Sequence, residues 1–163
     1  MMLVDVPIGN ETDASQIAEM AERTFRDSFA DQNAAADMDA YVREAFSLDR
    51  VRFELELAEN VFLIAQRSNS DVPVGYAKLR VGPAEPCVSG PTPLELHRIY
   101  VEADASGQGV GAALMRAVLA HAKAFGHETL WLGVWERNGR AIAFYERWGF
   151  VAVGSHAFQL GAD

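Results

Sequence analysis

The stretch Ser106-Gly107-Gln108-Gly109-Val110-Gly111 decides how this sequence is interpreted, because it sets three glycines between a predicted strand and a predicted helix. Glycine lets the backbone approach a ligand closely and adopt positive φ angles. The helix that follows offers free N–H groups and the positive end of its dipole. The stretch from Ser106 to Ala112 is therefore predicted to bind an anion and is suited to a pyrophosphate.

Two other interpretations of this glycine-rich turn remain open. The turn can be purely structural, with no ligand. It also fits the G-x-G-x-x-G/A fingerprint of dinucleotide-binding domains through Gly107, Gly109 and Ala112, with Glu128 about 20 residues further on. In such a domain, however, the ribose carboxylate belongs at the end of the second strand, whereas Glu128 precedes its strand. Too little chain follows Gly111 to complete a domain of that kind.

Composition narrows the class of protein. The 163 residues fit one domain, 1–163, that can bury a core. A net charge of −9 disfavours nucleic acid as a partner and mildly favours cationic small molecules, although solubility alone also explains it. One cysteine, Cys87, gives neither a disulfide nor a metal cluster, so no metal is expected. Without a signal peptide or an apolar run of about 20 residues, a cytoplasmic protein with no membrane partner is expected.

Hydrophobic periodicity and turn residues predict an alternating order of strands and helices. Gly126 and Gly149 are the expected stop signals of the last two helices. The predicted strands are 3–8, 61–66, 73–81, 94–101, 129–135 and 150–158, and the predicted helices run from residue 12 or 13 to 29 and over 37–46, 48–59, 109–125 and 138–148. This order predicts a mixed α/β sheet.

The glycine-rich turn resembles motif A of the GNAT superfamily of N-acetyltransferases, whose pattern is Arg/Gln-x-x-Gly-x-Gly/Ala. Ser106 stands where that pattern has Arg or Gln. Three later segments are similar to PaiA-type spermidine/spermine N-acetyltransferases: LHRIYV at 96–101, WLGVWERN at 131–138, and AIAFY at 141–145 followed by Gly149-Phe150. The resemblance spans nearly the whole chain.

The resemblance implies a GNAT fold and an acetyl-coenzyme A-dependent activity. The fold has a mixed, mostly antiparallel central sheet flanked by helices, splayed between strands 94–101 and 129–135. A final strand of the family would fall after Asp163 and is expected to be absent. The cofactor's pantetheine arm would pair with the backbone of Ile99, Tyr100 and Val101. A homodimer is a family-level expectation.

The implied reaction is direct acetyl transfer to a small amine, with a polyamine as the first candidate. One alternative acceptor is a protein N-terminus, a lysine or an amino compound. An alternative of another class is a non-catalytic sensor that binds acetyl-coenzyme A without turning it over.

Two residues of the last predicted helix are candidates for the site. Asn138 and Tyr145 are seven positions apart, or two helical turns, and so share a face. The resemblance implies that Tyr145 protonates the coenzyme A thiolate and that Asn138 contacts the cofactor. A core tyrosine and a helix cap are the structural alternatives.

The base is left open between three candidates. Glu95 lies six residues before Val101, where some GNAT members carry a catalytic Glu. An ion pair with Arg98 or Lys78 is the structural alternative for Glu95. His97 shares its strand face by simple alternation and has a suitable pKa. Solvent is the third candidate.

Overall fold

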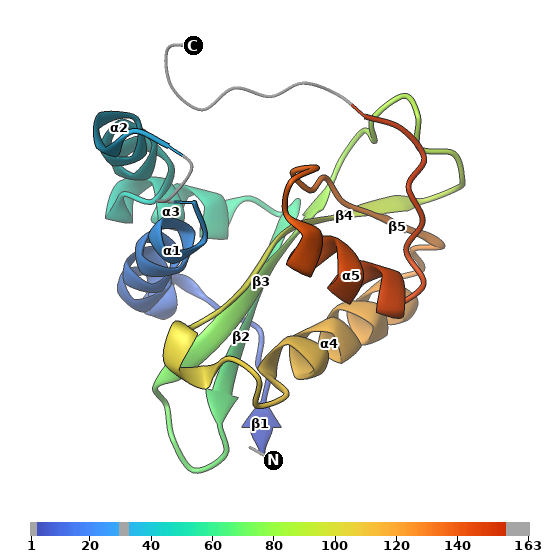
Figure 1. The fold of residues 1–163 in the computed structure, drawn as a ribbon. Coiled ribbons are helices and arrows are strands. Elements are labelled where there is room, and N and C mark those ends of the chain that lie inside the picture. The colour runs from blue at the N-terminus through green and yellow to red at the C-terminus, as the bar shows by residue number, and fades with distance from the viewer. Residues whose placement is uncertain (1–2, 30–32, 156–163) are drawn as a thin grey trace.

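The computed structural model describes residues 3–29 and 33–155. In this part of the chain a five-stranded sheet has the order β1-β2-β3-β4-β5 (Figure 1). The strands are β1 (Val4–Asp5), β2 (Asn60–Arg67), β3 (Pro73–Val81), β4 (Pro93–Val101) and β5 (Thr129–Trp131). Neighbouring strands are antiparallel except for the parallel pair β4–β5. The predicted mixed α/β sheet is therefore confirmed.

Helices cover both faces of the sheet (Figure 1). One face carries α1 (Ala14–Phe29), α2 (Ala35–Ala45) and α3 (Leu48–Glu56), and the other carries α4 (Val110–Ala124) and α5 (Gly139–Arg147). The first helix begins earlier than predicted, with a 3-10 turn, η1 (Glu11–Asp13), before α1. Its N-cap is Asn10, whose side chain accepts a hydrogen bond from the Thr12 N–H at 2.9 Å. The Asp13 side chain in turn accepts from the Asn10 N–H, so that Asn10 and Asp13 form a capping box.

Two apolar clusters, one on each face, hold these layers together. Alternation along β2 sends Phe62 and Ile64 to the α1–α3 face and Leu63 and Ala65 to the α4 face. The α1–α3 cluster is rich in aromatic rings, including Phe25 stacked on Tyr41 with ring centroids 4.7 Å apart. The α4 cluster is mostly aliphatic.

A bulge interrupts β4 at His97. Lys78 pairs with Arg98 and Leu79 with Leu96, so His97 has no partner in the β3–β4 ladder. As a result Leu96 and Ile99, three residues apart, both contribute to the α4 cluster. Simple alternation along β4 therefore breaks between Leu96 and Arg98, and a shared face for Glu95 and His97 stays a prediction.

The β5 strand is shorter than the predicted 129–135. It pairs with β4 only from Thr129 to Trp131, opposite Pro93, Leu94 and Glu95. The apolar character after Trp131 reflects packing rather than strand pairing, since Leu132 packs against the α4 cluster without pairing. The two strands therefore part after Glu95, within the region where a splay was expected.

The predicted strand 150–158 is not formed over its described part. Residues 150–155 have no strand structure, and residues 156–158 lie outside the described residues. Val151 and Val153 alternate as strand residues do, but they are 78% and 58% exposed and have no sheet neighbour. Of the helices in the described ranges, none combines the length and apolar character that crossing a membrane requires.

Candidate active site

The glycine-rich turn forms an open cradle at the start of α4. Gly107 and Gly109 have φ angles of +78° and +89°, which glycine adopts without strain. The first intrahelical bond runs from the Ala113 N–H to the Gly109 carbonyl at 3.0 Å. The N–H groups of Val110, Gly111 and Ala112 therefore lack intrahelical partners and are available to an anion. These donors suit the negative charge of a pyrophosphate, whose binding here stays a prediction.

Side chains around the cradle fix its shape. Gln108 donates from Nε2 to the Asp104 carbonyl at 3.2 Å, across the short 3-10 turn η3 (Ala103–Ala105). Ser106 accepts at Oγ from Nη2 of Arg140, 3.1 Å away in the first turn of α5. The first turn of α4 also packs closely against the second turn of α5, since a Cβ on Gly111 would lie 3.4 Å from Cε1 of Phe144.

The second half of β4 leads from the sheet to this cradle. Ile99 and Val101 pack against the α4 cluster, and Tyr100 packs against the opposite, α1–α3 cluster. On the side away from β3, pairing to β5 stops at Glu95 among the described residues. The backbone edge from Leu96 to Val101 therefore has hydrogen-bonding groups free for an extended ligand.

Tyr145 lies on α5 with its ring between two other aromatic rings. The ring centroids of Phe144 and Phe150 are 5.6 Å and 5.7 Å away. Burial raises the pKa of Tyr145 to about 12. Burial also raises the pKa of Tyr100, with further contributions from the neighbouring Tyr76 and Tyr145. The Tyr145 phenol therefore stays protonated at neutral pH, as an acid or hydrogen-bond donor must.

Asn138 is the N-cap of α5. Its Oδ1 accepts from the Ala141 N–H at 3.2 Å, so the structural alternative for this residue is observed. The same capping bond holds the Asn138 side chain at the end of α5 that faces the cradle, beside Arg140. A cap and a cofactor contact are compatible, because capping uses only the amide oxygen.

Glu95 makes an ion pair, but not with either predicted partner. Arg80, its pairing partner on β3, contacts Oε1 through Nε at 2.8 Å and through Nη2 at 2.7 Å. Arg98 and Lys78, the expected partners, bind Glu54 instead. The reason is the bulge at His97, which pairs Glu95 with Arg80 and turns Arg98 toward α3.

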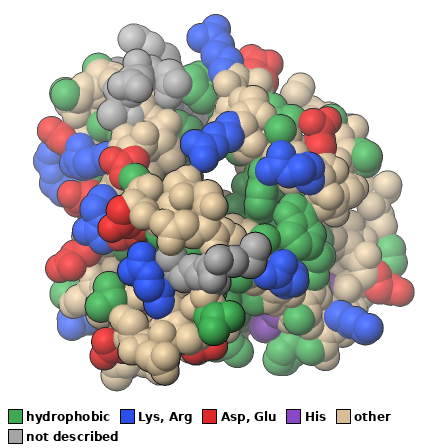
Figure 2. Space-filling model, turned by 60° about the horizontal axis from the view of Figure 1, so that its bottom comes forward, with side chains coloured by type: hydrophobic (Ala, Val, Ile, Leu, Met, Phe, Trp, Pro, Cys, Tyr) green, Lys and Arg blue, Asp and Glu red, His purple; other side chains and the backbone are tan. Residues whose placement is uncertain are grey.

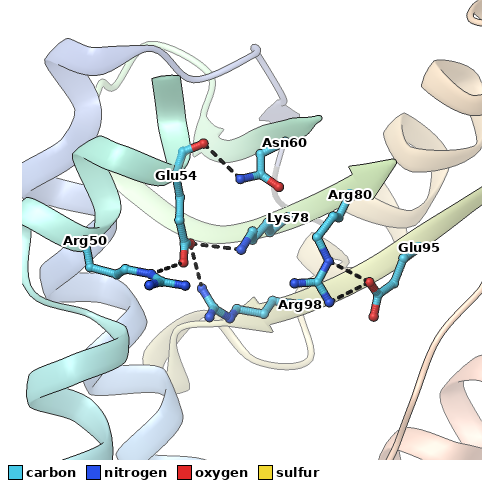
Figure 3. A network of polar contacts seen from close by, with 7 residues as sticks. All are labelled: Arg50, Glu54, Asn60, Lys78, Arg80, Glu95 and Arg98. Atoms are coloured by element: carbon cyan, nitrogen blue, oxygen red, sulfur yellow. Dashed lines mark hydrogen bonds and ion pairs between the residues drawn. The ribbon is translucent and has the colours of Figure 1, made fainter. Parts of the chain in front are cut away.

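Glu54 is the centre of a buried charged network that sequence analysis missed (Figure 3). Its residue is 3% exposed, and its carboxylate lies 2.9 Å from Lys78 Nζ, 2.9 Å from Arg50 Nε and 3.5 Å from Arg98 Nη1. Burial alone would raise the pKa of Glu54, but the hydrogen bonds from Lys78 and Arg50 outweigh burial and leave that pKa below its usual value. Burial lowers the pKa of Lys78 to about 8. Both partners are therefore charged at neutral pH.

Four buried side-chain polar atoms have no hydrogen-bond partner among the described residues: Asn60 Oδ1, Tyr76 Oη, His97 Nδ1 and Trp131 Nε1. Burial, together with the charges of Arg98, Lys78 and Arg80, lowers the pKa of His97 to about 2. A neutral His97 with so low a pKa is a weak base, and this disfavours the catalytic alternative considered for it.

One face of the molecule is hollowed (Figure 2). With the lower end of the molecule turned forward, hydrophobic side chains and Lys or Arg side chains border a hollow (Figure 2). Within the described ranges, no group of three or more His, Cys, Asp or Glu side chains is arranged to hold a metal ion.

Residues 16–150 match the family model described as the acetyltransferase (GNAT) family. The chain belongs to the GNAT family of acetyltransferases. It is 34% identical over 155 residues to an uncharacterised N-acetyltransferase of Mycobacterium bovis, covering 93% of this chain and 91% of that protein. It is therefore an N-acetyltransferase, and the dinucleotide-binding interpretation is wrong.

Solved structures share the fold at low sequence identity. The PaiA N-acetyltransferase of Thermoplasma acidophilum in complex with coenzyme A has a TM-score of 0.79 at 19% identity, covering 92% of this chain and 91% of that one. An aminoglycoside N-acetyltransferase in complex with coenzyme A has a TM-score of 0.73 at 16% identity, with coverages of 98% and 95%. The co-substrate of this GNAT fold is acetyl-coenzyme A.

Proposed function

We propose that this GNAT chain transfers the acetyl group of acetyl-coenzyme A directly to an amino group of a small molecule, with a polyamine as the first candidate. The observation that carries the proposal is the β4 edge from Leu96 to Val101, which has no strand neighbour on the side away from β3 in the described chain and leads into the cradle. The backbone of Ile99, Tyr100 and Val101 would bind the pantetheine arm by strand-like hydrogen bonds. The cradle from Ser106 to Ala112 would bind the pyrophosphate, and Asn138 would contact the cofactor from α5.

The residues near the open edge can assist acyl transfer. When bound, acetyl-coenzyme A supplies the thioester, whose C–S bond breaks as the amine nitrogen forms the new C–N bond. Glu95 would accept the amine proton, directly or through water. Both Arg80 contacts fall on Oε1 of Glu95, so Oε2 would be the accepting oxygen.

Tyr145 would act on the departing sulfur. A pKa of about 12 lies above that of an ordinary thiol, about 8.5. Full proton transfer from Tyr145 to the thiolate is therefore less favourable than from a tyrosine of normal pKa. Its main contribution would be a hydrogen bond to the sulfur as negative charge develops there.

The polyamine candidate is supported by the net charge of −9 and by the PaiA-type segments at 96–101 and 131–138. One observation favours a second candidate, an amino compound that also carries an anionic group. Beside Glu95, the ion pairs on the α1–α3 face bring together four cations and only two carboxylates: Arg50, Lys78, Arg80 and Arg98 against Glu54 and Glu95. This excess of positive charge would repel a polycation and attract a carboxylate or phosphate.

Free-thiol release from acetyl-coenzyme A across a panel of amines tests the proposal. The panel holds spermidine, spermine, amino acids, amino sugars and peptides, with reactions that lack the amine or the protein as controls for hydrolysis. Release with spermidine supports the first candidate, and release confined to amines that carry an anion supports the second. Cofactor binding without release for any amine would overturn the catalytic proposal in favour of a sensor.

A further inference from the structure

The cradle has a deficit of positive charge. Between Glu102 and Ala112 the chain carries two carboxylates, Glu102 and Asp104, and no basic side chain. Arg23 of α1 neutralises Glu102 through paired hydrogen bonds from Nε at 3.0 Å. A pyrophosphate bound here would meet backbone N–H groups but no cation from the loop itself, because Ser106 stands where the GNAT motif has Arg or Gln.

Arg140 is a basic side chain that reaches Ser106 of the cradle. It comes from the first turn of α5, 34 residues later in the chain, and donates from Nη2 to Ser106 Oγ at 3.1 Å. Phe144, one helical turn further on the same face, lies against Gly111 of α4. The packing of α5 on α4 therefore directs this face of α5, and Arg140 with it, toward the cradle.

The position of Arg140 in α5 is unfavourable without an anion. The first turn of a helix carries the positive end of the helix dipole, which repels a cation. No acidic residue lies in this first turn. An anion placed between the first turns of α4 and α5 would reverse this repulsion.

We propose that Arg140 binds the cofactor's pyrophosphate and supplies the positive charge that Ser106 does not. A guanidinium has five N–H donors, so Arg140 can keep its bond to Ser106 and still donate to a phosphate oxygen. Ser106 acts as a positioning residue for Arg140. The inference rests on the proposed role of the cradle and extends it to α5.

The test measures cofactor affinity by calorimetry, without turnover. The Arg140→Gln variant is expected to bind coenzyme A about 10-fold more weakly, as loss of a charged hydrogen bond implies. The loss should be equal for dephospho-coenzyme A, which keeps the pyrophosphate and lacks the 3′-phosphate. Arg116→Gln is the matched control, because it removes the same charge from an exposed residue of α4.

A second variant separates the charge from its position in the chain. In Ser106→Arg/Arg140→Gln the basic side chain moves to the first motif position, and affinity is expected to return to near the wild-type value.

Equal affinities of wild type and Arg140→Gln, or equal losses in Arg140→Gln and Arg116→Gln, would overturn the inference. A loss seen with coenzyme A but not with dephospho-coenzyme A would overturn the pyrophosphate assignment. Failure of the wild-type chain to bind coenzyme A would instead overturn the proposed cradle, and this inference with it.

Discussion

The two faces of the sheet are built on different physical principles. On the α4 face an aliphatic cluster supports a loop whose free donors are backbone N–H groups. On the α1–α3 face aromatic rings surround a buried network in which Glu54 holds charged side chains from α3, β3 and β4. The first face presents the same backbone donors whatever the side chains are, and the second depends on the identity of each side chain.

This difference separates the family from its specificity. A backbone cradle needs only glycines at fixed spacing, so it suits a co-substrate that all members of a family share. A network of side chains from several elements can change one residue at a time, which suits the recognition of different acceptors. The two faces are therefore expected to respond separately to substitution.

The largest expected effect is on the α1–α3 face. Glu54→Gln would leave Lys78 and Arg98 buried without a counter-charge, and we expect it to lower the free energy of unfolding by about 3 to 5 kcal/mol. Urea unfolding measures the change, with Glu56→Gln as a control on the exposed side of the same helix. The folded fraction should bind coenzyme A normally. A weak effect, comparable with that of Glu56→Gln, would show that water or another group solvates the network.

The next effect is confined to the cradle. Gly109→Val places a β-branched side chain at a φ of +89°, and we expect at least a ~100-fold loss of coenzyme A affinity. Gly126→Val is the matched control, because Gly126 has a φ of +77° at the far end of α4 and carries similar backbone strain. Calorimetric titration of both variants gives the comparison. Normal binding by Gly109→Val, or an equal loss in both variants, would remove the cradle from the cofactor site.

A smaller effect is expected at Tyr145, which packs against the α4 cluster. Tyr145→Phe keeps the packing against Phe144 and Phe150 and removes only the phenol O–H. We expect kcat to fall at least ~10-fold, the low side of what acid catalysis contributes, with little change in coenzyme A affinity. Steady-state kinetics with the best amine of the panel measures the change. An unchanged kcat would exclude Tyr145 from the mechanism.

The sequence predicted backbone features set by local rules, and it failed for contacts between side chains of different elements, which is the same division that separates the two faces. The strand 73–81 and the positive-φ glycines at both ends of α4 depend on local rules, and the structure reproduces them. The partner of Glu95 was wrong because one unpaired residue, His97, shifts the β4 register, and no local signal marks a bulge.

The contact of Arg140 with Ser106 was missed because it joins residues far apart in the chain. The only local hint was a cation in the first turn of a helix, where the dipole disfavours it. The strand predicted at 150–158 fails over its described part for a related reason, since alternating valines specify a strand only where a neighbour is present to pair with them.

The smallest expected effect tests whether water is excluded from the α1–α3 face around His97. Its pKa of about 2 in the folded chain lies below the ordinary value of 6.5, so between these values the unfolded chain binds a proton that the folded chain does not. The contribution of His97 to stability is then full above pH 6.5 and falls as the pH drops toward 2, and His97 is expected to account for about 0.7 kcal/mol of the loss between pH 7 and pH 6. Urea unfolding of wild type and His97→Gln at both pH values isolates this share, because the other titrating groups are common to both. An identical pH dependence in the two proteins would mean that folded His97 takes up its proton normally, and that water reaches this part of the network.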